Sequence, residues 1–132
     1  MDKLNLSGYK QFSRLPLGQF NEFKFSVYVL DFQWNYLFVN DFCKNNLGAR
    51  GRDLLGKNMW ETFEELGQDP VFIRLKYETE RGIETNLITT SPINSQRLSI
   101  VGCRLSDCYF FSASILPNKE DLIHELRGEL RK

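Results

Sequence analysis

The hydrophobic pattern of the chain changes from a helical period to a period of two after Gly82, and this change sets the fold class. Before it, Asp69 can cap a helix whose first position is Pro70, and Gly82 ends that helix. After it, residues 83–90 follow a period of two, and two further strand-like stretches, 96–105 and 109–115, come after turn-forming residues. The pattern therefore predicts one helix followed by a three-stranded antiparallel meander.

The residues before this helix predict a hairpin and two short helices. Residues 25–31 and 36–39 are rich in Val, Tyr, Phe and Leu, which favour strands. Asn40 can cap a helix that Gly48 ends, and Asn58 stands where a second short helix begins. The order of elements is thus two strands, short helices, one longer helix, three strands and a helical tail, which is an α+β fold.

Residues 27–56, VYVLDFQWNYLFVNDFCKNNLGARGRDLLG, resemble the first half of a PAS domain. Such domains show a strand ending in Asp, a "YVN" leading into a helix, a Gly, and an "ELLG" turn. The matching residues here are Asp31, Val39, Asn40, Gly48, Leu54, Leu55 and Gly56. The resemblance covers roughly residues 20–116. It implies a five-stranded antiparallel sheet in order 2-1-5-4-3, with the helices crossing one face around a small cavity.

The length of 132 residues is that of one domain. We expect a PAS-like core over 25–116, between a helical segment over 1–24 and a helix over 117–132. In the first segment a short helix capped by Ser7 is expected to dock on the core. Segments at both ends are amphipathic, and PAS domains commonly dimerise through such segments.

Charge and cysteine content bear on partners and location. Lys plus Arg and Asp plus Glu both number 17, so no basic surface is expected to bind nucleic acid. Apolar runs fall far short of the ~20 residues of a membrane span, and the first residues lack the apolar stretch of a secretory leader. Three cysteines without framework spacing suit a reducing compartment. We therefore expect a cytoplasmic protein.

The resemblance implies sensing through the cavity, whose walls would be the faces of the elements that meet inside. The candidate cavity residues are Met59, Phe63, Phe72, Leu75, Leu87, Leu98, Ile100 and Phe111. They would line a site for a small apolar ligand, or they simply pack against one another. Trp60 would be a lid over the cavity or a packing residue.

Known PAS cofactors can be tested against the sequence. Flavin-binding light sensors carry a reactive Cys directly after the Gly-x-Asn at residues 56–58, where this chain has Met59. Heme-binding members use a His on the longer helix, and residues 69–81 contain none. His124, the one histidine, is expected on the surface without a metal. We therefore expect neither heme nor a covalent flavin adduct.

The three thiols allow more than one interpretation. Cys43 lies on the first short helix, and it is expected to be buried as a small hydrophobic residue rather than to react. Cys103 and Cys108 flank the last hairpin turn. They would be two free thiols or, less in keeping with a reducing compartment, a redox pair.

No catalytic constellation is recognisable, so an enzyme is not expected. Glu78 and Glu80 are interpreted as surface partners of Arg74 and Lys76, one turn away. The first hypothesis is a sensory signalling module that acts through a ligand, dimer contacts and a partner such as a histidine kinase. The alternative is a small-metabolite binding protein or a cryptic enzyme that uses the cavity.

The end of the last strand bears on how a signal would leave the domain. Many linked PAS domains end it in Asp-(Ile/Val)-Thr, whereas residues 114–117 here read Ser-Ile-Leu-Pro. Pro117 blocks a helix continuous with the strand, which favours a self-contained adaptor. The expected form is a homodimer that buries Leu4, Tyr9, Phe12, Ile123 and Leu126.

Overall fold

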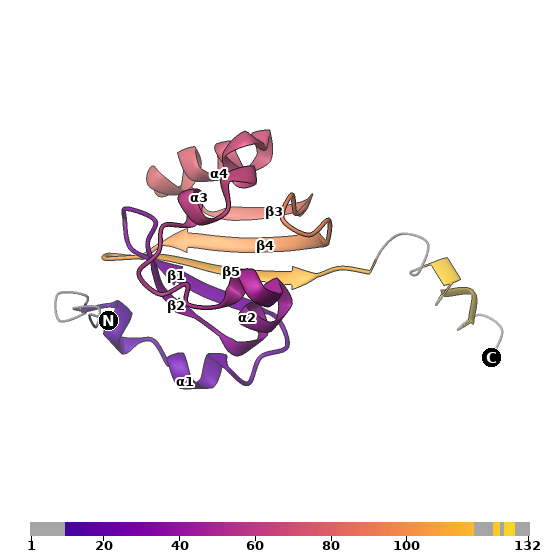
Figure 1. The fold of residues 1–132 in the computed structure, drawn as a ribbon, viewed down its shortest axis with the longest axis horizontal. Helices are drawn as coiled ribbons and strands as arrows, with labels where there is room; N and C mark the ends of the chain where they lie inside the picture. The colour runs from indigo at the N-terminus through magenta and orange to yellow at the C-terminus, as the bar shows by residue number, and fades with distance from the viewer. Residues whose placement is uncertain (1–9, 118–122, 125, 129–132) are drawn as a thin grey trace.

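The computed structural model of the chain describes residues 10–117, 123–124 and 126–128. A five-stranded antiparallel sheet in order β2-β1-β5-β4-β3 organises the described part, which confirms the predicted order. The strands are β1 (Ser26–Leu30), β2 (Tyr36–Val39), β3 (Thr85–Thr90), β4 (Arg97–Arg104) and β5 (Tyr109–Ile115). In Figure 1 the first two strands, β1 and β2, are neighbours, and the last strand, β5, lies between β1 and β4.

Short helical elements between β2 and β3 cover one face of the sheet, which we call the inner face (Figure 1). In chain order they are α2 (Asp41–Leu47), η2 (Gly48–Gly51), α3 (Met59–Thr62), η3 (Glu64–Gln68) and α4 (Pro70–Glu80). Three of these helices begin at the predicted capping residues. Each capping side chain accepts hydrogen bonds from backbone N–H groups of the first turn, which have no partner within the helix. These caps are Asn40 for α2, Asn58 for α3 and Asp69 for α4.

The strand after α4 begins at Thr85, two residues later than the alternating pattern indicates. Gly82 has a φ of 79°, which a residue with a Cβ adopts only with strain. Its left-handed conformation lets the Ile83 N–H bond to the Glu78 carbonyl over 2.9 Å, in the usual hydrogen-bond pattern of a helix end. Ile83 therefore belongs to the helix cap rather than to the strand.

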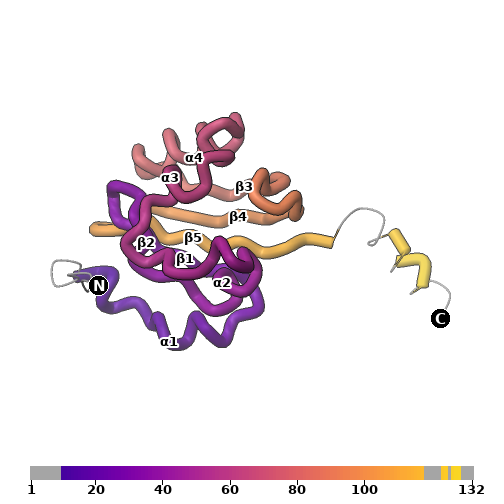
Figure 2. Tube along the Cα trace, in the orientation of Figure 1, coloured from indigo at the N-terminus to yellow at the C-terminus, as the bar shows by residue number. Residues whose placement is uncertain are grey.

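The outer face of the sheet is partly covered by residues 10–24 (Figure 2). Here η1 (Phe12–Arg14) and α1 (Leu17–Phe20) precede β1. The Phe20 ring packs edge-on against Phe110 of β5, with ring centroids 5.7 Å apart. The Gln11 and Phe12 N–H groups also donate to the Asp107 carboxylate, over 2.6 and 3.2 Å. The segment is therefore docked on the sheet, while the predicted cap Ser7 lies outside the described residues.

Asn40 connects the two faces. Its side chain is fully buried and makes four hydrogen bonds with backbone groups. The carbonyl oxygen accepts from the N–H groups of Val27 and Cys43, and the amide donates to the carbonyls of Phe20 and Phe25. One side chain thus joins the N-terminal segment, β1 and the start of α2.

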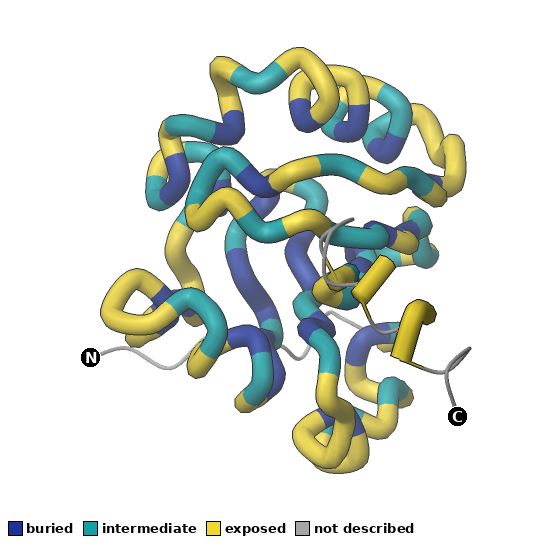
Figure 3. Tube along the Cα trace, turned by 90° about the vertical axis from the view of Figure 1, so that its right-hand side faces the viewer, coloured by how far each residue is buried: buried dark blue, intermediate teal, exposed yellow. Residues whose placement is uncertain are grey.

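The buried residues form two clusters, one on each face of the sheet. Figure 3 marks the buried positions along the chain in dark blue. The larger one fills the space between the inner face and α2–α4, and it includes Leu30, Trp34, Met59, Phe63, Leu75, Ile100 and Phe111. The smaller one lies under the N-terminal segment and contains Phe12, Val29, Leu37 and Cys108. The larger cluster surrounds the cavity described next.

A candidate ligand cavity between the sheet and the helices

A cavity of about 70 Å³ lies within the larger cluster, between the inner face of the sheet and the helices. Its apolar lining is Leu47, Met59, Phe63, Leu66, Phe72, Ile93, Leu98, Ile100 and Ala113. Its polar lining is Ser26, Tyr28, Tyr36, Cys43, Asn46, Ser91, Asn94 and Gln96. None of these residues carries a formal charge at neutral pH, so the cavity suits an uncharged occupant.

Five of the predicted cavity residues line it. Met59 begins α3, Phe63 directly follows α3, Phe72 lies on α4, and Leu98 and Ile100 lie on β4. The helical positions were predictable because residues one turn apart share the buried face of an amphipathic helix. That these residues bind a ligand remains a prediction.

Leu75, Leu87 and Phe111 do not line the cavity, which corrects the predicted set. All three pack in the larger cluster instead. Phe111 stacks on Tyr28 with ring centroids 5.4 Å apart, and its ring occupies the space in which a side chain at Gly102 would lie. Leu75 is one turn beyond Phe72, and Leu87 lies on β3, so both fill the core beside the cavity.

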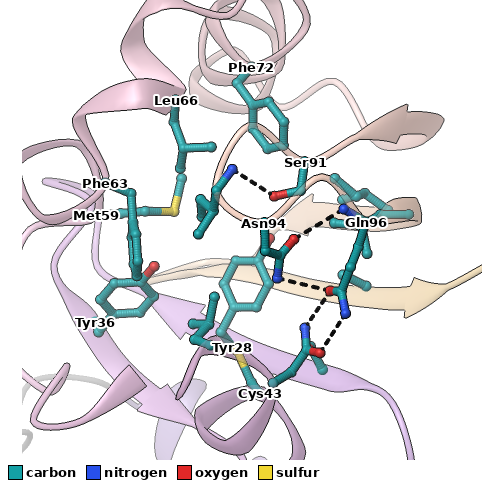
Figure 4. A pocket seen from close by; sticks show the side chains of 17 residues that line it. Tyr28, Tyr36, Cys43, Met59, Phe63, Leu66, Phe72, Ser91, Asn94 and Gln96 are labelled. Atoms are coloured by element: carbon teal, nitrogen blue, oxygen red, sulfur yellow. Dashed lines mark hydrogen bonds between the residues drawn. The ribbon is translucent and has the colours of Figure 1, made fainter. Parts of the chain in front are cut away.

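Two tyrosines of the adjacent strands β1 and β2 form part of the sheet side of the cavity. The rings of Tyr28 and Tyr36 meet edge-on with centroids 6.3 Å apart, and Tyr36 is only 5% exposed. Figure 4 shows both rings reaching into the cavity, with Leu66 and Phe72 beyond them. Within residues 10–117 neither hydroxyl has a hydrogen-bond partner. The cavity residues predicted from the sequence included neither tyrosine.

Burial, reinforced by the nearby thiol of Cys43, raises the pKa of Tyr28 well above its ordinary value of 10.0. Burial and the neighbouring Tyr28 do the same to the pKa of Tyr36. Both side chains are therefore neutral phenols at physiological pH, and each hydroxyl can donate one hydrogen bond. The same environment that disfavours a phenolate disfavours any other anion.

Cys43 is buried and free, as expected for a small hydrophobic residue. Burial raises the pKa of its thiol to about 11. A hydrogen bond with the Ser26 hydroxyl acts to lower this pKa, but burial has the larger effect. The thiolate is the nucleophilic form, and it is scarce at neutral pH here. Cys103 and Cys108 are free thiols too, and burial beside Asp107 raises the pKa of Cys108 to about 12.

Three amide side chains close one side of the cavity, and we call them the amide clasp: Asn46, Asn94 and Gln96. Asn46 at the end of α2 and Gln96 in the β3–β4 turn exchange two hydrogen bonds, of 2.8 and 2.9 Å. The Asn94 amide adds a third bond of 3.0 Å to the Gln96 side-chain oxygen (Figure 4). These polar groups therefore satisfy one another, and the clasp joins α2 to the β3–β4 turn.

Comparison with solved structures identifies the arrangement. The photoactive yellow protein domain from the sensor histidine kinase Ppr of Rhodospirillum centenum superposes with a TM-score of 0.62 at 14% identity. The likeness covers 79% of this chain and 96% of that one. The chain has the PAS fold.

Other domains with this fold are as similar. The PAS domain of Bordetella pertussis BvgS gives a TM-score of 0.58 at 14% identity, over 95% of this chain and 98% of that one. The PAS domain of the Cronobacter turicensis RpfR quorum-sensing receptor, solved in complex with BDSF, gives 0.55 at 10% identity. That match covers 72% of this chain and 96% of the RpfR domain. At such identities the likeness concerns the fold alone.

No protein-family model and no curated protein sequence matches the chain. In the described part of the chain, no helix is both long enough and apolar enough to span a membrane. The same residues contain no group of three or more metal-binding side chains.

The cavity is small beside the sites of cofactor-sized ligands. Sites for cofactor-sized ligands occupy roughly 300–1,000 Å³, several times the 70 Å³ found here. Met59 follows Asn58 at the position where flavin-binding relatives carry Cys, and its side chain is part of the cavity wall. The inward residues of α4 are Phe72, Leu75 and Thr79, none of which is an iron ligand in hemes.

Trp60 packs beside this PAS core and does not line the cavity. Its ring meets that of Trp34 edge-on, with centroids 5.4 Å apart. Of its two expected roles, the geometry supports packing rather than a lid. Within the described residues neither indole N–H has an acceptor, although both are buried.

Part of the outer face of the PAS sheet is uncovered. Ile88 of β3 and Val101 of β4 are 60% and 51% exposed. Because Ile88 pairs with Ser99 and Val101 pairs with Asn86, the two apolar side chains are diagonal neighbours on one face. We call this pair the outer patch.

The expected dimer contacts have different positions. Phe12 is 2% exposed and packs in the smaller cluster of its own chain, so it cannot contact a second copy as predicted. The sequence pattern of a flanking segment is the same whether its apolar residues cover the sheet of their own chain or contact a second copy. Here Phe12 covers the sheet of its own chain. Ile123 and Leu126 are exposed, and Leu4 and Tyr9 lie outside the described residues.

Proposed function

We propose that the chain is a sensory signalling module that binds a small molecule in its cavity and acts on other proteins through its surface, without catalysis. The observation that carries the proposal is an uncharged, largely apolar cavity between the sheet and the helices of a PAS fold. Solved domains of the same fold come from a sensor histidine kinase and a quorum-sensing receptor. A histidine kinase or another cytoplasmic signalling protein is accordingly the proposed partner.

Three glutamates of η3 and α4 lie in surface ion pairs rather than in the cavity. Glu78 and Glu80 form surface ion pairs with Arg74 and Lys76, as the one-turn spacing predicted, with N–O distances of 2.7 and 3.1 Å. Glu65 is paired with Arg50 over 2.6 Å at the surface. Exposed pairs of this kind contribute little to a pocket chemistry or to stability.

The end of the sheet supports action in trans. β5 ends at Ile115, and the Leu116 N–H bonds to the Arg97 carbonyl over 2.8 Å before Pro117. Because proline has no N–H and its ring excludes a preceding helical turn, a helix cannot run straight out of the strand. A self-contained adaptor that contacts its partner non-covalently fits this geometry.

The first test is native mass spectrometry of freshly purified full-length chain, with an absorbance scan of the same sample. A mass excess that disappears on denaturation is expected, without visible absorbance. A bare polypeptide mass in every preparation would count against small-molecule binding.

The second test concerns the dimer, which we propose forms through the outer patch with help from Ile123 and Leu126. Light scattering of the chain at tens of micromolar is expected to give twice the monomer mass. The variant Ile88→Glu, Val101→Glu is expected to give a monomer, because each buried carboxylate would lack a partner.

Ile73→Glu is the matched control, since Ile73 is half exposed on α4, on the opposite side of the sheet. It should leave the mass unchanged. A wild-type monomer would contradict the dimer, and with a bound ligand it would favour the alternative, a small-metabolite binding protein that does not signal.

A further inference from the structure

The polar lining of the cavity divides into groups that are satisfied and groups that are not. The side chains of Asn46, Asn94 and Gln96 bond to one another in the amide clasp. The Ser91 hydroxyl accepts the Ile93 N–H over 3.2 Å. The hydroxyls of Tyr28 and Tyr36 are different, because no group in residues 10–117 forms a hydrogen bond with either.

A hydroxyl that borders a cavity needs a partner inside that cavity, either a water or a ligand, because an unpaired polar group in a protein core is unfavourable. Tyr36 is almost fully buried, and its hydroxyl borders the cavity rather than packed atoms. Phenylalanine at these two positions would keep the ring packing, including the stack of Tyr28 on Phe111, without this penalty. The hydroxyls therefore indicate an acceptor that is supplied from outside the chain.

We propose that Tyr28 and Tyr36 form a paired donor site for an uncharged, mainly apolar ligand that carries a hydrogen-bond acceptor such as a carbonyl oxygen. The inference rests on the proposed function and names the ligand class. Lys, Arg and His are absent from the lining, so an anionic group would be buried without a counter-charge. Met59, Phe63 and Leu66 offer the rest of the ligand only apolar contacts.

The volume sets the size of the part that is recognised. A cavity of about 70 Å³ holds a few waters or a ligand fragment of a few heavy atoms. Probes for the site should therefore be small. Cyclopentanone carries a hydrogen-bond acceptor, cyclopentane carries none, and pentanoate carries an anionic carboxylate.

The readout is the methyl NMR spectrum of chain labelled at methionine. The sequence has two methionines, and Met59 lines the cavity. Met59→Leu assigns its signal. Titration of each probe then measures occupancy of the cavity in the folded, full-length chain.

The variant Tyr28→Phe, Tyr36→Phe should weaken cyclopentanone binding while leaving cyclopentane binding unchanged or tighter. One net hydrogen bond corresponds to a loss of about twofold to tenfold in affinity for each hydroxyl. Pentanoate should bind more weakly than cyclopentanone. Tyr77→Phe, which removes the same atom from an exposed ring on α4, is the control and should change nothing.

A second measurement does not depend on a probe. Because the hydroxyls lack protein partners, the double variant should have a denaturation midpoint equal to or above that of the unchanged chain. A clear fall in that midpoint would show that the hydroxyls are used within the protein, and would overturn the proposal.

The proposal is also wrong if cyclopentanone and cyclopentane both shift the Met59 signal and the double variant binds cyclopentanone as tightly as before. In that case the cavity binds small molecules, but the tyrosine hydroxyls do not select them. If no probe shifts that signal, both this inference and the proposed cavity function are wrong.

Discussion

Replacement of Asn40 by alanine should destabilise the fold more than any other single loss of a polar side chain named above. The change removes four hydrogen bonds and leaves the N–H groups of Val27 and Cys43 and the carbonyls of Phe20 and Phe25 buried without partners. At about 1 kcal/mol for each net hydrogen bond, the free energy of unfolding falls by about 4 kcal/mol. The helix cap alone accounts for about 1 kcal/mol of this.

The measurement is urea unfolding followed by fluorescence of the two tryptophans, one of which, Trp34, is buried. With a slope of about 2 kcal/mol per molar urea, the midpoint should fall by about 2 M. A domain of ordinary stability, about 5–15 kcal/mol, still folds after this loss in most of that range. Asn45→Ala is the matched control, because Asn45 is exposed on the same helix. A loss below about 1 kcal/mol for Asn40→Ala would refute the hydrogen-bond reasoning.

A pH dependence separates the donor half of this network from the acceptor half. Asn40→Asp keeps the oxygen that accepts from Val27 and Cys43 but turns a second oxygen toward the carbonyls of Phe20 and Phe25. Burial and these carbonyls favour the protonated acid, so the pKa of the introduced carboxyl is higher in the folded chain than in the unfolded one. The folded chain then binds more protons, and stability falls as pH rises from the unfolded pKa. The variant should be closer to the unchanged protein at pH 4 than at pH 7, and an equal difference at both would contradict the assignment.

Two further outcomes follow from packing and exposure. Gly102→Ala should lower the free energy of unfolding by about 1–3 kcal/mol, because its methyl group would overlap the Phe111 ring, whereas Gly67→Ala, which faces open space, should not; urea midpoints compare the two. Iodoacetamide at pH 8 should modify Cys103 before Cys43, since Cys103 is partly exposed whereas burial raises the Cys43 pKa to about 11. Peptide mass mapping over time measures the order, and earlier modification of Cys43 would show that α2 opens readily.

Local chemistry explains which elements could be predicted. Asn40, Asn58 and Asp69 cap helices in the structure because the cap depends on a side chain and on N–H groups two or three residues away. The sheet order depends on contacts between distant residues, and it came from the resemblance rather than from propensities. The late start of β3 at Thr85 was missed because the Gly82 cap extends beyond the last helical residue.

The candidate site was harder to predict than the fold. Periodicity identifies inward residues, but it does not say whether an inward residue fills space or borders a cavity. Phe111 fills space because Gly102, opposite it on β4, leaves room for its ring. Tyr28, stacked on that ring, is thereby held at the cavity. Such an outcome depends on several side chains at once, and no local pattern encodes it.

The position of α2 makes it the element best placed to link the cavity with the surface. Its first turn is tied through Asn40 to the N-terminal segment, which covers part of the outer face. Its last turn is tied through Asn46 to Gln96 in the β3–β4 turn, and Cys43 between them borders the cavity. A ligand too large for the present volume would displace part of the cavity wall, to which α2 contributes Cys43, Asn46 and Leu47. Because a packed core shifts between discrete arrangements rather than deforming freely, a displacement of α2 would move contacts on both faces of the sheet together. The proposed sensory function requires this coupling between an enclosed site and the outer patch.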